Sequence, residues 1–152
     1  MAIEDIYLEL AEKHELPDYH EFNKEFEISS IDTEEFLLRE IRRKMMERFD
    51  YYAKILQELF QPDPHSSSIF EAKNFTDKDR ENIFNLYSKI MAMMRHSVVV
   101  SLDNSDEQNA KFINSSYKEW LRIKEKVLPI AMRIKSTWEN HFVDKIKAEY
   151  FG

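Results

Sequence analysis

Histidine and carboxylate side chains are the residues of this chain that could ligate a metal ion or transfer protons. The chain has five histidines. A di-iron site in a helical bundle needs Glu-x-x-His on two helices, and a helical zinc site uses His-Glu-x-x-His. Neither spacing occurs here. One pair, His141 with Asp144, has helical spacing and is a weak metal candidate; a surface histidine beside an acid is the simpler interpretation.

Glycine and cysteine are nearly missing from the 152 residues: Gly152 is the one glycine, and there is no cysteine. Phosphate-binding loops, dinucleotide-binding turns and nucleophile elbows all need glycine at a turn, so they are excluded. The lack of cysteine excludes thiolate nucleophiles and disulfides. We therefore expect no catalytic residue, no metal and no cofactor, which favours a non-enzymatic protein. A metal-dependent helical-bundle enzyme assembled from distant acids and histidines stays as an alternative.

A basic run is the densest positive feature and could contact phosphates. It contains Arg39, Arg42, Arg43 and Arg48. Three features argue against nucleic-acid binding. The pI is near 5.3, the acids Glu40 and Glu47 are interleaved with the bases, and no aromatic residue lies among the bases for stacking. Nucleic-acid association is therefore an alternative function, and these arginines are also candidates for binding an acidic protein segment.

The net charge of −7 comes from the N-terminus, because residues 1–38 hold 12 acidic and 2 basic residues. Aromatic side chains alternate with these acids at Tyr7, Tyr19, Phe22 and Phe26. Such a segment can dock on a basic, partly apolar surface. The surface could be Arg39 and Arg43 or the last helix of the same chain, another protein, or a second copy of the chain. We take these four aromatic residues as candidates for partner binding.

The elements that must position these residues are helices, because apolar residues recur at steps of three and four and turn residues are few. We expect an all-α fold: a bundle of three long antiparallel helices at about 33–61, 77–103 and 106–148, the last bent near Pro129. Asp32 with Glu35 predicts the first N-terminus, and Thr76 predicts the second. Residues 62–75 should form a loop.

A short acidic helical arm, residues 1–31, should precede the bundle of residues 32–152 in one domain. Its helices are expected near residues 3–15 and 18–27. Asn104 is expected to take the left-handed backbone conformation between the last two helices, and few other positions should need it.

The first ten residues lack a basic region and a long apolar region, and the longest apolar run has five residues. We therefore expect no secretory signal, no membrane association and a cytoplasmic protein. The leading functional hypothesis is a helical protein–protein interaction or scaffold module. Its partner would be another protein or a second copy in a homodimer.

Overall fold

A computed structural model describes the backbone of residues 2–65 and 67–150, and side chains up to residue 140. Every regular element in this part of the chain is a helix, which confirms the all-α prediction. Two compact units are present: unit 1 is Met1–Ala53 with Ile90–Trp120, and unit 2 is Lys54–Lys89 with Leu121–Gly152. Each unit is described separately below. No described helix combines the length and apolar character needed to cross a membrane.

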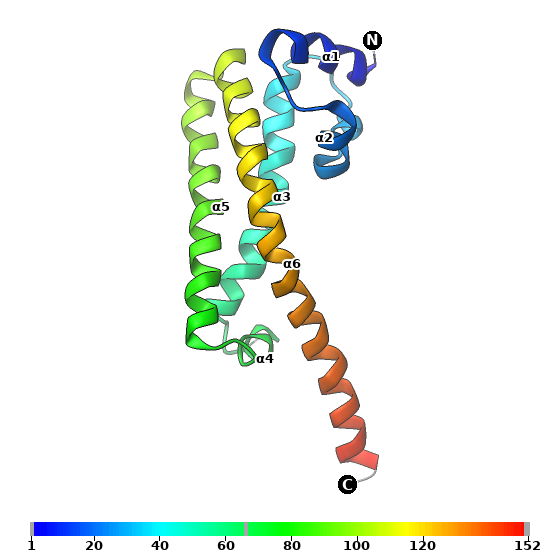
Figure 1. The fold of residues 1–152 in the computed structure, drawn as a ribbon, viewed down its shortest axis with the longest axis vertical. Helices are drawn as coiled ribbons and strands as arrows, with labels where there is room; N and C mark the ends of the chain where they lie inside the picture. The colour runs from blue at the N-terminus through cyan, green and yellow to red at the C-terminus, as the bar shows by residue number, and fades with distance from the viewer. Residues whose placement is uncertain (1, 66, 151–152) are drawn as a thin grey trace. The chain divides into compact units, whose positions relative to one another are not determined.

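The N-terminal arm folds as predicted into α1 (Ile3–His14) and α2 (Tyr19–Phe26), followed by the short 3₁₀ helix η1 (Ile28–Ser30) (Figure 1). The Asp18 side chain accepts a hydrogen bond from the backbone N–H of Glu21 and caps α2. Both α-helices end at a residue in the left-handed region, where the backbone N–H still bonds back into the helix.

Helix α3 (Leu37–Phe60) starts later than predicted, so the capping role assigned to Asp32 and Glu35 was wrong. Ile31, Leu37 and Leu38 are all buried in unit 1. Burying each such side chain contributes about 1.5–3 kcal/mol, against about 1 kcal/mol for a helix cap. The apolar anchors on either side therefore decide where α3 begins, and residues 32–34 cross between them without regular secondary structure.

The later helices are α5 (Asp77–Asp103) and α6 (Asp106–Tyr150), joined by a turn at Asn104 with the predicted positive φ of 60°. Thr76 caps α5 as predicted: its hydroxyl accepts from the Asp79 N–H, and its own N–H donates to the Asp79 carboxylate. The predicted loop 62–75 also contains a short helix, α4 (Ser68–Ala72). Helix α6 runs through Pro129 without a break, and a bend there stays a prediction.

We predicted that few residues besides Asn104 would need the left-handed backbone conformation, and this prediction was incomplete. Four described residues other than glycine have a positive φ, namely Glu15, Glu27, Phe36 and Asn104. Each ends a helix or directly precedes one. The turns between these helices therefore need left-handed residues, and the chain meets the need without glycine.

The core of unit 1 is aromatic. Phe22 lies against Tyr7, Phe26 and Tyr117, with ring centroids 6.0, 5.0 and 5.2 Å apart. Phe49 connects Phe26 to the fully buried Trp120. These contacts join the N-terminal arm to α3 and α6 within unit 1, so the arm is part of this core.

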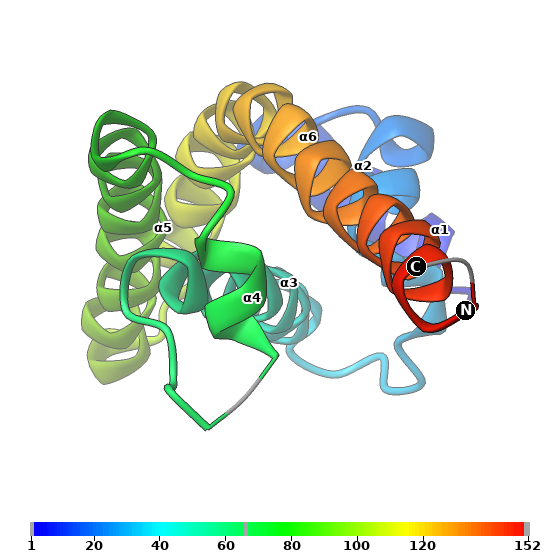
Figure 2. The same ribbon diagram turned by 90° about the horizontal axis from the view of Figure 1, so that it is seen from below.

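Unit 2 is held together by two smaller aromatic clusters. Phe60 at the end of α3 packs against Phe84 and Tyr87 of α5. Phe70 of α4 packs on Trp138 of α6, and the Trp138 indole N–H donates to Glu71. The segment from α4 to the start of α5 is thereby fixed against α6. Figure 2 shows α4 at the lower end of α3 and α5.

Candidate functional site

The four aromatic residues predicted to bind a partner lie inside unit 1. Tyr7 and Phe22 are fully buried, and Tyr19 and Phe26 are nearly so. The Tyr7 hydroxyl donates to the Pro17 carbonyl oxygen at 2.7 Å. Burial, with smaller contributions from Tyr117 and Asp18, raises the pKa of Tyr7 well above its ordinary value. Binding of a partner by these residues stays a prediction and would require the arm to leave the core.

The N-terminal arm is also held by polar contacts. Trp120 donates its indole N–H to the buried Glu25 carboxylate at 2.7 Å, and Arg48 lies 3.8 Å from the same oxygen. Asn114 of α6 donates to the His14 carbonyl oxygen at the end of α1. Of the surfaces proposed for the arm within its own chain, the last helix is therefore used, together with Arg48.

Arg42 is buried, although the sequence placed it on a basic face. Its guanidinium donates to the side chains of Asn109 and Ser97 at 2.8 Å, and to Asn104 Oδ1 and the Ser97 carbonyl oxygen at 3.3 Å. Burial lowers the pKa of Arg42, and Arg43 and Arg39 lower it further. Arg42 therefore connects α3 to the α5–α6 turn.

The other arginines of the basic run are not equally accessible either. Arg39 donates to the Asn104 carbonyl oxygen and lies over the Phe36 ring. Arg48 pairs with Glu25, and its guanidinium lies over the Tyr52 ring. Arg43 is well exposed, but it pairs with Glu40 at 2.8 Å. The run is thus divided among separate intramolecular contacts. Its binding to phosphate or protein stays a prediction.

The weak metal candidates, His141 and Asp144, have side chains outside the described residues. Within the described residues, no three histidine, aspartate or glutamate side chains come together as a metal site would require.

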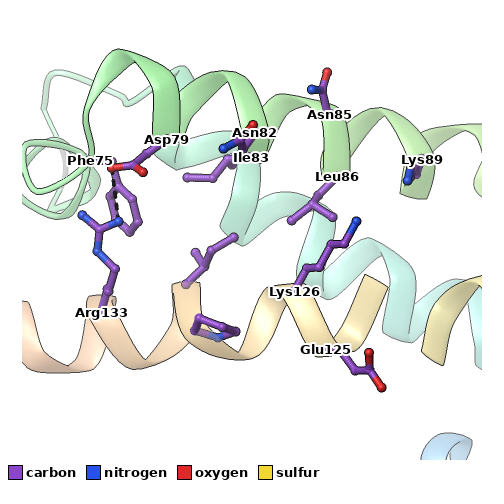
Figure 3. A pocket seen from close by; sticks show the side chains of 12 residues that line it. Phe75, Asp79, Asn82, Ile83, Asn85, Leu86, Lys89, Glu125, Lys126 and Arg133 are labelled. Atoms are coloured by element: carbon purple, nitrogen blue, oxygen red, sulfur yellow. Dashed lines mark hydrogen bonds and ion pairs between the residues drawn. The ribbon is translucent and has the colours of Figure 1, made fainter. Parts of the chain in front are cut away.

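Unit 2 has an open groove on its surface. It has a volume of about 810 Å³ and lies between the N-terminal half of α5 and the middle of α6 (Figure 3). Its apolar lining residues are Phe75, Ile83, Leu86, Pro129 and Ile130. A volume of this size is typical of binding sites, which usually combine an apolar floor with a few polar groups.

One end of the groove is closed by an ion pair. Arg133 of α6 bonds to the Asp79 carboxylate at 3.2 Å and to the Asn74 carbonyl oxygen, with its guanidinium 4.3 Å from the Phe75 ring centroid. The Thr76 backbone N–H, the Thr76 hydroxyl and Arg133 together lower the pKa of Asp79. Asp79 is thus ionised at neutral pH, and Arg133 is engaged.

Two lysines of the groove have no such partner. Neither Lys89 nor Lys126 forms a hydrogen bond or ion pair with another described residue, and both are exposed. Lys126 extends from α6 toward Leu86 of α5, and Glu125 is also one of the lining residues (Figure 3). The groove therefore combines a nearly buried apolar floor with an excess of one positive charge among its lining residues.

Pro129 adds a backbone acceptor to the groove wall. Proline has no N–H, so the Glu125 carbonyl, four residues earlier in α6, lacks its helical donor. Both residues line the groove.

Sequence reasoning missed this groove, although the pattern is visible in retrospect. The two helices contribute residues to it at the same relative positions i, i+3, i+4 and i+7: Asp79, Asn82, Ile83 and Leu86 from α5, and Lys126, Pro129, Ile130 and Arg133 from α6. Half of these residues are polar, so neither stripe stands out from the sequence. Comparisons with protein-family models, curated proteins and solved structures found no match to this chain.

Proposed function

We propose that this protein is a non-enzymatic interaction module that binds another protein in the unit 2 groove. The observation that carries the proposal is the groove between α5 and α6, in which the exposed Pro129 and the half-buried Ile130 lie beside Lys89 and Lys126. Buried apolar area supplies the affinity of most protein contacts, and a few polar groups fix the orientation. The composition agrees with this function, because the glycine and cysteine motifs of many enzymes are missing.

Apolar side chains on the outside of α6 extend the surface available to a partner. Leu128 and Met132 are each 60% exposed, and both lie in the same part of α6 as the groove-lining Pro129 and Ile130. Neighbouring exposed apolar residues of this kind are typical of protein-binding surfaces.

The test uses random peptides selected against the full-length protein and two tryptophan variants. Asn82→Trp places a large ring in the groove, whereas Ser88→Trp adds the same ring to α5 outside it. We expect selected peptides to shift NMR signals of groove residues, to lose at least tenfold in affinity on Asn82→Trp and to keep it on Ser88→Trp. Selection of no peptide, or of peptides that bind both variants equally, would contradict the proposal.

A further inference from the structure

Each wall of the unit 2 groove is a stripe of side chains along one helix, and the two stripes have the same residue spacing. The lining residues of α5 and α6 follow the i, i+3, i+4, i+7 spacing. In helical proteins, stripes with this spacing face a neighbouring helix, whose side chains fill the spaces between their ridges. The groove thus offers two adjacent ridges on which a third helix could pack.

The length of the groove suits about two turns of such a helix. The lining residues extend from Asp79 to Lys89 along α5, which is about 15 Å, and from Glu125 to Arg133 along α6, which is about 12 Å. Apolar side chains at positions i, i+4 and i+7 of a bound helix would cover about 10.5 Å. Three such side chains could lie along Pro129 and Ile130, above the nearly buried Ile83 and Leu86.

The charge of the groove determines the chemistry of the partner. Asp79 is compensated by Arg133, and the remaining charged lining residues are Lys89, Lys126 and Glu125, which leaves an excess of one positive charge (Figure 3). Unit 2 as a whole has 12 Lys and Arg against 10 Asp and Glu, whereas unit 1 has 10 against 19. An acidic ligand is therefore attracted to unit 2 and to this groove within it.

Resting on the proposed function, we infer that the occupant is an acidic amphipathic α-helix of a partner protein. Its apolar face packs on the exposed Pro129 and the half-buried Ile130, above the nearly buried Ile83 and Leu86. Its glutamate or aspartate residues pair with Lys89 and Lys126. This is the helix-in-groove mode of recognition, in which the anchors recur at helical spacing.

The experiment measures the affinity of the full-length protein for three synthetic helical peptides by titration calorimetry. The peptides share apolar residues at i, i+4 and i+7 and carry glutamate, glutamine or lysine at the flanking positions. We expect the glutamate peptide to bind about tenfold more tightly than the glutamine peptide, because two exposed ion pairs are formed. This advantage should shrink as salt rises from about 50 to 500 mM.

Protein variants test which lysines produce the advantage of the glutamate peptide. The double substitution Lys89→Gln with Lys126→Gln should abolish the advantage of the glutamate peptide over the glutamine peptide. Lys124→Gln is the matched control, since it removes a lysine of α6 that does not line the groove, and it should retain the advantage. Circular dichroism and thermal unfolding verify that each variant folds.

The outcomes separate this inference from the proposed function. If Asn82→Trp blocks all three peptides but glutamate gives no advantage, the proposed binding in the groove stands. The inference that the partner is acidic is then wrong. If a concentration-dependent dimer forms and Asn82→Trp disrupts it, the occupant is a second copy and the inference is overturned. Binding of no helical peptide overturns the inference, and the random-peptide selection then tests the proposed function separately.

Discussion

At the scale of single residues, burial assigns roles that residue type alone does not reveal. Arg42 and Glu25 look like surface charges in the sequence, yet each is 6% exposed. Arg42 is satisfied by neutral oxygens, and Glu25 accepts from the Trp120 indole beside Arg48. A buried charge is tolerated because its hydrogen bonds replace those it made with water. These two residues therefore act in the packing of unit 1.

Tyr7 provides a pH-dependent test at this scale. Tyr7→Phe should cost about 1 kcal/mol at pH 7, because the hydrogen bond to the Pro17 carbonyl is lost. The pKa of Tyr7 is raised in the folded protein, so above pH 10 the unfolded chain releases this proton and the folded protein keeps it. Stability then falls with rising pH, by up to about 1.4 kcal/mol per pH unit from this group.

The variant lacks this loss, so its deficit should shrink as pH rises from 10 toward 11.5, as measured by urea unfolding. Tyr51→Phe is the control, because Tyr51 is 62% exposed, and its stability should follow the native protein at every pH. A deficit of Tyr7→Phe that stays constant up to pH 11.5 would contradict the burial of the hydroxyl.

At the scale of elements, the helix ends carry strain that the shortage of glycine imposes. Glu15 and Glu27 end α1 and α2 with φ of 55° and 53°. For a residue with a Cβ atom, the left-handed backbone conformation costs about 1–2 kcal/mol, whereas for glycine it costs little. These positions are tolerated because the helices that they end are anchored by buried rings on α1 and α2.

Replacing Glu27 with glycine should therefore raise the free energy of unfolding by about 1 kcal/mol, since the strain is relieved and the side chain is exposed. Urea denaturation at pH 7 measures the change. Glu9→Gly is the matched control: Glu9 is an exposed acid inside α1, where glycine should cost about 1 kcal/mol. A loss of stability on Glu27→Gly would show that the left-handed conformation is not strained.

At the scale of the whole molecule, the chain distributes charge and aromatic residues unequally. Unit 1 contains most of the acidic excess together with the aromatic core, and unit 2 has the small basic excess and the groove. The N-terminal arm belongs fully to unit 1, where it covers Phe49 and Tyr117. The arm is therefore an integral part of the folded unit.

Deletion of residues 1–31 tests this conclusion. It removes six buried apolar side chains, namely Tyr7, Tyr19, Phe22, Phe26, Ile28 and Ile31. At about 1.5–3 kcal/mol each, their loss matches or exceeds the usual net stability of a domain. We expect the shortened chain to lose its cooperative thermal transition and to bind a hydrophobic dye. Leu8→Gln, at a half-exposed position of the arm, should keep the native transition; a stable, cooperative deletion variant would contradict the arm's role.

The sequence by itself determined the helical class, most helix limits and the exclusion of glycine- and cysteine-dependent chemistry. These properties depend on local spacing, capping at Thr76, and residue types, all of which can be read along the chain. Only the tertiary structure decided that Arg42 is buried, that α3 begins at Leu37 and that Lys89 and Lys126 face one groove. The reason is physical: burial and charge compensation depend on which distant residues meet, and local periodicity specifies a helix face without specifying what lies against it.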